Sequence, residues 1–208
     1  MMETADPYAG NWVPPWDIGH PQPALARLAE QGRLVGRVLD VGCGTGEHAL
    51  LAASIGLDAL GVDAAPLGIA AARQKAIERG LVARFVVHDA TALLDLGAQF
   101  ETVIDSGLLE AIGEEHWPAY VASLADVIVR GGHCFLLEFS EHEPGDWGPK
   151  RISQRDIREA FGEGWVVESI EPSRFELLDS DASRRQFEAW NVPFRPAAKA
   201  WLASIRRA

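Results

Sequence analysis

The chain has 208 residues, a formal net charge of −11 and two widely separated cysteines. It therefore suits one domain, with at most a modest lid, that buries its core without a disulfide framework or a cysteine-rich zinc site, and its acidity disfavours a nucleic-acid ligand because an acidic surface repels phosphate backbones. The sequence shows no leader pattern and no long apolar run, so we expect a cytoplasmic protein without membrane contact.

The first 23 residues are rich in proline and aromatic residues, among them Tyr8, Trp12 and Trp16. Prolines at this density preclude a regular helix. Aromatic side chains at this density favour packing onto the rest of the domain. We therefore predict a lid segment over residues 1–23, followed by a helix over residues 23–34.

From residue 36 onward, short apolar runs alternate with helical patterns. Apolar strands that alternate with helices are typical of a parallel sheet covered on both faces. The expected strands are 37–41, 58–62, 84–88, 100–105 and 133–139. The expected helices are 47–55, 66–79 and 114–129, with a loop around residues 93–98 and a glycine break at residues 131–132.

The chain after residue 140 departs from this alternation. Ser153 is expected to cap the start of a short helix that ends near Phe161. Residues 165–170 and 174–178 are predicted as separate β segments, and residues 198–205 as a terminal strand. The polar segment 179–196 is predicted to be an irregular, exposed excursion.

A glycine-rich turn follows the first predicted strand, where Asp40 precedes Gly42, Gly44 and Gly46. Glycines let the main chain approach a ligand closely, and in doubly wound folds this turn lies at the topological switch point where ligands bind. The spacing G-x-G-x-G differs from the G-x-G-x-x-G of nicotinamide dehydrogenases, which disfavours that class. The motif thus predicts a bound nucleoside-type ligand, the alternative being a tight turn without one.

Three further strand ends carry acidic residues. Asp63 ends the second predicted strand, where doubly wound nucleotide folds place an acid on ribose hydroxyls, and it could also cap the helix that opens at Pro66. Asp89 follows the third strand, where its carboxylate could accept a hydrogen bond from the exocyclic amine of adenine or simply shape the turn. Asp105 and Ser106 end the fourth strand and are expected to line the floor of the ligand site.

These four elements, in this order, resemble the class I S-adenosylmethionine-dependent methyltransferase superfamily over residues 36–140. A closer resemblance is to bacterial thiopurine-methyltransferase-like proteins, a group with enzymes that methylate and detoxify aromatic heterocycles. This closer resemblance rests on residues 15–23 (PWDIGHPQP), 105–108 (DSGL), 143–149 (EPGDWGP) and 200–207 (AWLASIRR).

The resemblance implies a doubly wound α/β fold, with a seven-stranded, mostly parallel sheet whose last strand is antiparallel and whose two faces are covered by helices. It also implies one methyltransferase domain over residues 1–208. Its parts would be the N-terminal lid segment (1–23), the cofactor-binding core (36–140), and the substrate-side elements and closing strands (141–208).

S-adenosylmethionine is the implied cofactor, with S-adenosylhomocysteine as its product and with the lid folded over it. The histidines are scattered without metal-ligand spacing, so no metal site is expected. The implied cofactor contacts are Trp12, Trp16, Ile18, Asp40, Gly42, Cys43, Gly44, Thr45, Gly46, Asp63, Ala64, Asp89, Ala90, Asp105, Ser106 and Gly107.

Methyl transfer from a sulfonium is an in-line displacement, for which the protein supplies alignment and exclusion of water. A general base helps only where the nucleophile is protonated at the working pH. Relatives often carry an aromatic residue and a histidine where this chain has Leu109 and Glu110, so Glu110 replaces that proton acceptor or the reaction needs none. The candidate bases are Glu110, Asp105, His142 and Asp146. Predicted contacts to a flat substrate are Trp16, Glu110 and Trp147.

We therefore expect a methyltransferase that acts on a small, aromatic or heterocyclic S, O or N nucleophile and functions as a monomer or homodimer. The sequence Asp105-Ser106-Gly107-Leu108 differs from the Asn-Pro-Pro-Tyr type of motif that amine-methylating nucleic-acid enzymes use. The alternative is a non-catalytic S-adenosylmethionine-binding protein on the same scaffold, which would lack an open acceptor pocket.

Overall fold

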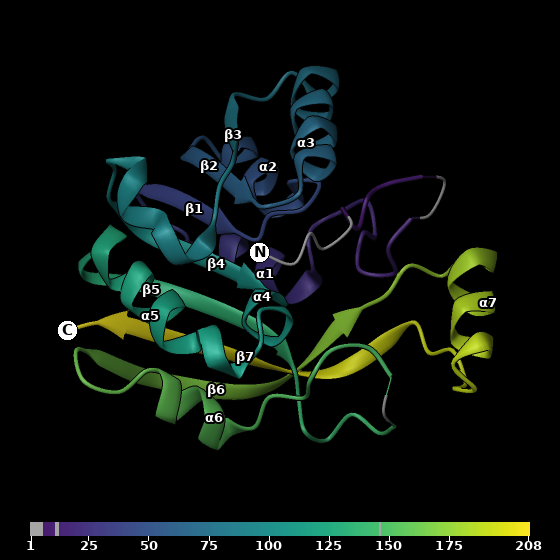
Figure 1. The fold of residues 1–208 in the computed structure, drawn as a ribbon. Coiled ribbons are helices and arrows are strands. Elements are labelled where there is room, and N and C mark those ends of the chain that lie inside the picture. Colours follow the sequence, from purple (N-terminus) through teal and green to yellow (C-terminus); the bar gives the residue numbers. More distant parts are fainter. Residues whose placement is uncertain (1–5, 11–12, 146) are drawn as a thin grey trace.

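The computed structural model describes residues 6–10, 13–145 and 147–208. In this part of the chain, seven strands form one sheet with the order β3-β2-β1-β4-β5-β7-β6 (Figure 1). The strands β1 to β5 pair in parallel, and β7 runs antiparallel to both β5 and β6. The expected fold class is thereby confirmed. The strands are β1 Arg37–Val41, β2 Asp58–Asp63, β3 Ala83–Val87, β4 Phe100–Ser106, β5 Ile128–Phe139, β6 Trp165–Glu176 and β7 Ala197–Arg207.

Helices pack on both faces of the sheet and enclose two hydrophobic clusters. Because side chains alternate along a strand, Ile104 of β4 joins the cluster under α1, α2 and α3, whereas Val103 joins the cluster under α4, α5 and α6. The helices are α1 Pro23–Glu30, α2 Glu47–Ser54, α3 Pro66–Arg79, α4 Leu108–Ala111, α5 Trp117–Val127, α6 Gln154–Ala160 and α7 Asp181–Ala189, with the 3₁₀ helices η1 Ala90–Leu96 and η2 Glu114–His116.

Local sequence signals account for several helix ends. Pro66 opens α3, and Gly80 ends it with a φ of 62°, a conformation that favours glycine. The hydroxyl of Ser153 accepts a hydrogen bond from the N–H of Asp156 at 3.0 Å, and the Asp156 carboxylate accepts one from the N–H of Ser153 at 2.8 Å. This capping box confirms the predicted start of α6.

The prediction of an irregular, exposed segment over residues 179–196 was wrong, because it contains α7. Ser180 caps this helix through its hydroxyl, which accepts from the N–H of Ser183 at 3.1 Å. Phe187 is 1% exposed and packs its ring 4.8 Å from that of Trp147. The sequence of this helix is polar apart from Phe187 and its alanines, so its composition resembles that of a surface loop.

Other boundaries differ from those predicted for physical reasons. Residues 165–178 do not split into two segments, because β6 is an edge strand and tolerates Pro172, which lacks an N–H, opposite Trp201. Strand β5 already begins at Ile128, so the predicted helix over 114–129 is shorter, and the glycines at 131–132 lie inside the strand. Helix α1 ends at Glu30 rather than near residue 34, and the short helices η1 and α4 were not predicted.

The described part of the lid segment has no regular helix or strand before residue 23, as its prolines predicted. Hydrogen bonds join it to the end of β6 and to the residues that follow this strand. The N–H of Leu178 donates to the carbonyl of Pro15 at 2.7 Å, and the Gln22 side chain exchanges two hydrogen bonds with the backbone of Glu176. Among the described helices, none is both long and apolar enough to cross a membrane.

Candidate active site

A cavity of about 600 Å³ opens at the carboxyl ends of the central strands. Its wall combines the turn after β1, the ends of β2 and β4, the described part of the lid, the loop after β5, and α7. Sites for cofactors and small ligands have volumes in this range and occur at this edge of doubly wound sheets. The position of the cavity is the one that the glycine motif predicted.

The glycine turn after β1 is closely packed on both of its sides. A Cβ on Gly46 would lie 2.6 Å from the ring of Phe85 and 2.8 Å from Ala72, so a glycine is needed there for α2 to pack against α3 and β3. A Cβ on Gly44 would collide instead with the hydroxyl of Tyr8, which reaches the turn from the lid segment. The backbone at Gly44 therefore forms a cradle on the cavity side, under the lid.

Asp63, at the end of β2, lies in the cavity wall and holds the glycine turn. One carboxylate oxygen accepts a hydrogen bond from the N–H of Gly44 at 2.7 Å, and the other accepts one from the N–H of Ala65 at 2.7 Å. Burial raises the pKa of Asp63, and these two N–H groups oppose that rise. Each carboxylate oxygen keeps a second acceptor site for a ligand.

Asp40 lies beneath the turn rather than in the cavity wall. It is 1% exposed, and its carboxylate accepts a hydrogen bond from the N–H of Ala49 in α2 at 3.0 Å. Burial raises the pKa of Asp40 to about 8, and it lowers the pKa of the adjacent His48 to about 4. The role that this geometry shows for Asp40 is to connect β1 to α2.

The structure brings many of the predicted cofactor residues into one wall and leaves others outside it. Asp89 is exposed, and its carboxylate caps η1 by accepting from the N–H and the hydroxyl of Thr91, both at 2.8 Å, which lowers the pKa of Asp89. In the wall are Trp16, Ile18, Gly42, Cys43, Gly44, Thr45, Asp63, Ser106 and Gly107. Outside it are Asp40, Gly46, Ala64, Asp89, Ala90 and Asp105. Trp12 and Asp146 lie outside the described residues.

Glu110 lies in the cavity wall but is only 6% exposed. Its carboxylate accepts a hydrogen bond from the N–H of Phe139 at 2.5 Å, which connects α4 to the end of β5. Burial raises the pKa of Glu110 to about 8, although that N–H and the charge of Arg151 act in the opposite direction. Glu110 is therefore a buried carboxyl beside the cavity and does not face bulk solvent.

Two more carboxyl groups lie behind Glu110, at the ends of β4 and β5. Asp105 is fully buried and accepts hydrogen bonds from the N–H of Leu108 and the hydroxyl of Tyr120, both at 2.8 Å. Glu138 is also fully buried, and one of its oxygens accepts from the N–H of Glu110 at 3.1 Å. Sequence reasoning missed Glu138, although an acid at the carboxyl end of the apolar run 134–139 was a usable signal.

Ser106 presents an unpartnered hydroxyl at the cavity. Its Oγ is buried and has no hydrogen-bond partner among the described residues. A buried polar group in this state costs about 1–3 kcal/mol. A ligand with a polar atom at this position would remove that cost.

Aromatic side chains also line the cavity. Trp147 is 6% exposed, donates its indole N–H to the carbonyl of Pro144 at 3.0 Å and packs against Phe139 with ring centroids 5.5 Å apart. His142, by contrast, is exposed, lies outside the cavity wall and packs edge-on against Trp201 at 5.3 Å. The aromatic wall, as we name this surface, consists of Trp16, Phe139, Trp147, Phe175, Phe187 and Trp190.

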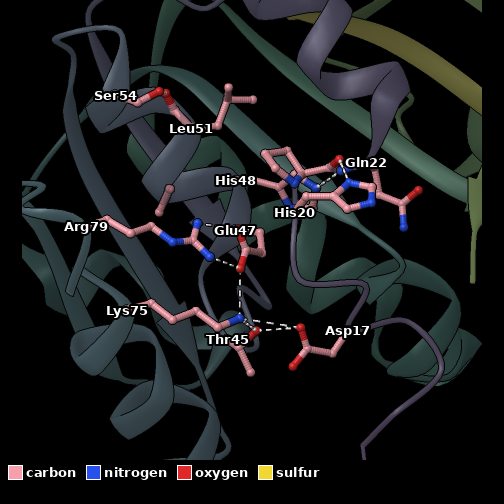
Figure 2. Close-up of polar contacts among 12 residues, drawn as sticks. Asp17, His20, Gln22, Thr45, Glu47, His48, Leu51, Ser54, Lys75 and Arg79 are labelled. Atoms are coloured by element: carbon pink, nitrogen blue, oxygen red, sulfur yellow. Dashed lines mark hydrogen bonds and ion pairs between the residues drawn. The ribbon is translucent and has the colours of Figure 1, made fainter. Parts of the chain in front are cut away.

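A polar network fastens the lid segment to the glycine turn, as Figure 2 shows. Asp17 accepts a hydrogen bond from the hydroxyl of Thr45 at 2.9 Å and lies 3.5 Å from the ammonium of Lys75. Lys75 also donates to Thr45 at 2.7 Å and to the buried Glu47 at 2.8 Å, and Arg79 pairs with Glu47. Burial works to raise the pKa of Glu47, but the bonds from Arg79 and Lys75 outweigh it and lower that pKa. The lid is therefore held by an ion-pair network that spans α2 and α3.

The sheet order with its antiparallel last strand, the glycine turn and the acid that ends β2 together define a Rossmann-like protein with a nucleoside-type site. Comparisons with known proteins narrow this class. A family model described as a methyltransferase domain matches residues 38–132. A 2-heptyl-1-hydroxyquinolin-4(1H)-one methyltransferase of Mycobacteroides abscessus is 38% identical over 193 residues, which are 91% of this chain and 85% of the relative.

Two solved structures are also similar to this chain. One comes from work on the conversion of a disulfide bond into a thioacetal group during echinomycin biosynthesis. It is 34% identical to this chain with a TM-score of 0.79, and the match covers 93% of this chain and 84% of that one. The fold of a magnesium protoporphyrin IX methyltransferase from Synechocystis PCC 6803 with bound S-adenosylhomocysteine is similar, with a TM-score of 0.64, 23% identity, and coverage of 88% of this chain and 80% of that one. The chain belongs to the class I S-adenosylmethionine-dependent methyltransferases.

S-adenosylmethionine is accordingly the cofactor of this enzyme. The residues present fit it. The glycine turn lies in the cavity wall with Tyr8 of the lid against Gly44, the Ser106 hydroxyl needs a partner, and the Asp63 carboxylate can accept further hydrogen bonds, all around one cavity.

Proposed function

We propose that this methyltransferase methylates a hydroxyl, or an equivalent thiol or ring nitrogen, on a flat aromatic heterocycle. The observation that carries the proposal is the aromatic wall, which lines the same cavity as the glycine turn and in which the ring centroids of Trp147 and Phe187 lie 4.8 Å apart. Such rings offer a stacking surface for a planar ligand. The name of the Mycobacteroides relative, which specifies a hydroxyquinolinone, agrees with an acceptor of this class.

The cofactor would be held by the glycine turn and the residues around it. We propose that the backbone around Gly44 and the Asp63 carboxylate bind its polar groups, with Asp63 on the ribose hydroxyls, and that Ser106 supplies a further hydrogen bond. Trp16 and Ile18 would cover it from the lid. The contact of Asp89 and Ala90 with adenine stays a prediction, because both lie outside the cavity wall.

The bound cofactor supplies a methyl group that is already activated as part of a sulfonium. The chain contributes alignment, which can account for about 7–11 kcal/mol of the barrier, together with a lid and an aromatic wall that exclude water. Glu110 is our candidate general base, since it borders the cavity and its pKa of about 8 keeps a usable fraction ionised at neutral pH. Asp105 lies outside the wall and positions α4, and His142 lies too far toward the surface to share this role.

The remaining parts of the proposal concern the setting of the enzyme. We propose one domain over residues 1–208, acting in the cytoplasm as a monomer or homodimer. Methylation would mask the acidic or nucleophilic atom of the acceptor, so a detoxifying role is part of the hypothesis.

The test is a turnover assay with purified protein, S-adenosylmethionine and matched pairs of acceptors. Each pair consists of a hydroxylated aromatic heterocycle and a saturated ring with the same hydroxyl. We expect release of S-adenosylhomocysteine only with the aromatic members. Cofactor binding without turnover on any planar acceptor would instead support a non-catalytic S-adenosylmethionine-binding protein.

A further inference from the structure

Glu138 combines full burial with an incomplete set of hydrogen bonds. Its Oε2 accepts from the N–H of Glu110 at 3.1 Å, whereas its Oε1 has no partner among the described N–H and O–H donors. A fully buried carboxylate in this state is costly, because charge that leaves water needs hydrogen bonds or an ion pair to compensate. A neutral carboxyl removes the problem, since its O–H can donate to another acceptor.

The acceptors are the two neighbouring carboxylates. Glu138 lies on the same face of the sheet as Asp105, because Leu136, two residues earlier on β5, pairs with Asp105 of β4, and its Oε2 accepts from the N–H of Glu110 on α4. Hydrogen bonding with Glu138 acts on the pKa of both Asp105 and Glu110. Among the described residues, the other titratable or charged groups that act on this cluster are Asp40 from β1, Tyr120 from α5, Cys134 from β5 and Arg151 from the loop after β5. Three buried carboxylates near one cation cannot all stay ionised, so at least one must hold a proton.

The proton belongs on the carboxyl that has neither a second hydrogen bond nor a neighbouring cation to stabilise its charge. Asp105 accepts from Leu108 and Tyr120, which stabilise its ionised form, and Glu110 accepts from Phe139 and has Arg151 nearby. Glu138 accepts only from the N–H of Glu110. Burial and the charges of Asp105 and Glu110 raise the pKa of Glu138 well above the ordinary value, in the same direction as this count.

We propose that Glu138 is a positioning residue of the methyl-transfer site that stays protonated, donates its carboxyl O–H to the adjacent carboxylates and thereby stabilises the ionised form of Glu110 at the cavity. This role rests on the proposed function of Glu110 as the base. Glu110 would take the proton that the acceptor hydroxyl loses. The oxygen of that hydroxyl bonds to the methyl carbon, and the bond from the methyl carbon to the sulfonium sulfur breaks, with its electron pair left on the sulfur. Glu138 keeps its own proton throughout.

The first test needs neither cofactor nor turnover. Infrared spectra of the cofactor-free wild type and of Glu138→Gln are compared at about pH 9, above the pKa of Glu110 and Asp40. We expect the substitution to remove the carbonyl band of a protonated carboxyl. Loss of a carboxylate band instead would show that Glu138 is ionised and would overturn the proposal, even if methyl transfer itself had been demonstrated.

The second test uses the pH dependence of kcat/KM with a weakly acidic acceptor. Glu138→Gln keeps a hydrogen-bond donor and should leave the acidic limb in place, whereas Glu138→Met removes the donor and should move that limb upward by about one pH unit, a tenfold loss at neutral pH. A downward shift in both variants would contradict a neutral Glu138. A protein that methylates no acceptor would refute the proposed function but leave the infrared result valid.

Discussion

Replacing Glu110 by glutamine tests the proposed base directly. Glutamine retains an oxygen that can accept from the N–H of Phe139, so α4 should stay in place while the proton acceptor is lost. Since general-base catalysis contributes about 10²–10⁴-fold, we expect kcat to fall by this factor for a weakly acidic hydroxyl acceptor, which corresponds to about 3–5 kcal/mol of barrier. A thiol or an acidic phenol, which ionises on its own, should lose far less.

The pH dependence sharpens the prediction. With a pKa of about 8, Glu110 is about one-tenth ionised at pH 7 and half ionised at pH 8, so wild-type kcat for the weak acid should rise with pH and level off above about pH 9. Glu110→Gln should lack this rise. The assay is release of S-adenosylhomocysteine, with the melting temperature and cofactor affinity as controls. Equal losses for the weak acid and the thiol would show that Glu110 is a structural residue and not a base.

Three further predictions concern the cofactor, the lid and stability. Asp63→Ala should weaken S-adenosylmethionine binding at least tenfold in calorimetry, about 1.4 kcal/mol, and an unchanged affinity would remove the ribose assignment. Asp17→Ala breaks the contacts to Thr45 and Lys75 and should raise the KM for the cofactor about two- to tenfold with little change in kcat; no change would mean that the lid is held elsewhere. Because burial raises the folded-state pKa of Asp40 to about 8, its stabilising contribution is complete below about pH 4 and is lost as pH rises toward and through 8. Urea titrations of Asp40→Asn should therefore show a free energy of unfolding that falls less steeply over that range, by up to about 1.4 kcal/mol per pH unit, and a slope equal to that of the wild type would contradict the buried, neutral carboxyl.

The parts of the fold that the sequence predicts are those whose causes are local. The strand before Gly42, the proline that opens α3 and the Ser153 capping box each carry their signal within a few residues. The order of the strands from β3 to β5 and the position of the cavity then follow from the rules of doubly wound sheets, whereas the antiparallel last strand was implied only by the family resemblance.

What the sequence could not predict depends on contacts between distant segments. Asp17 and Lys75 meet only because the lid crosses the turn after β1, and the buried role of Glu110 depends on Phe139 and Glu138 from β5. Helix α7 forms because Phe187 finds an aromatic partner in the loop after β5. No short-range pattern encodes these pairings.

The most direct test of the central claim is a crystal structure of the protein with S-adenosylhomocysteine and a hydroxylated aromatic heterocycle. We expect the nucleoside along the glycine turn, with its ribose within hydrogen-bonding distance of Asp63, and the acceptor between the sulfur and the aromatic wall, with its hydroxyl beside Glu110. A nucleoside bound elsewhere, or an acceptor hydroxyl remote from Glu110, would contradict this claim.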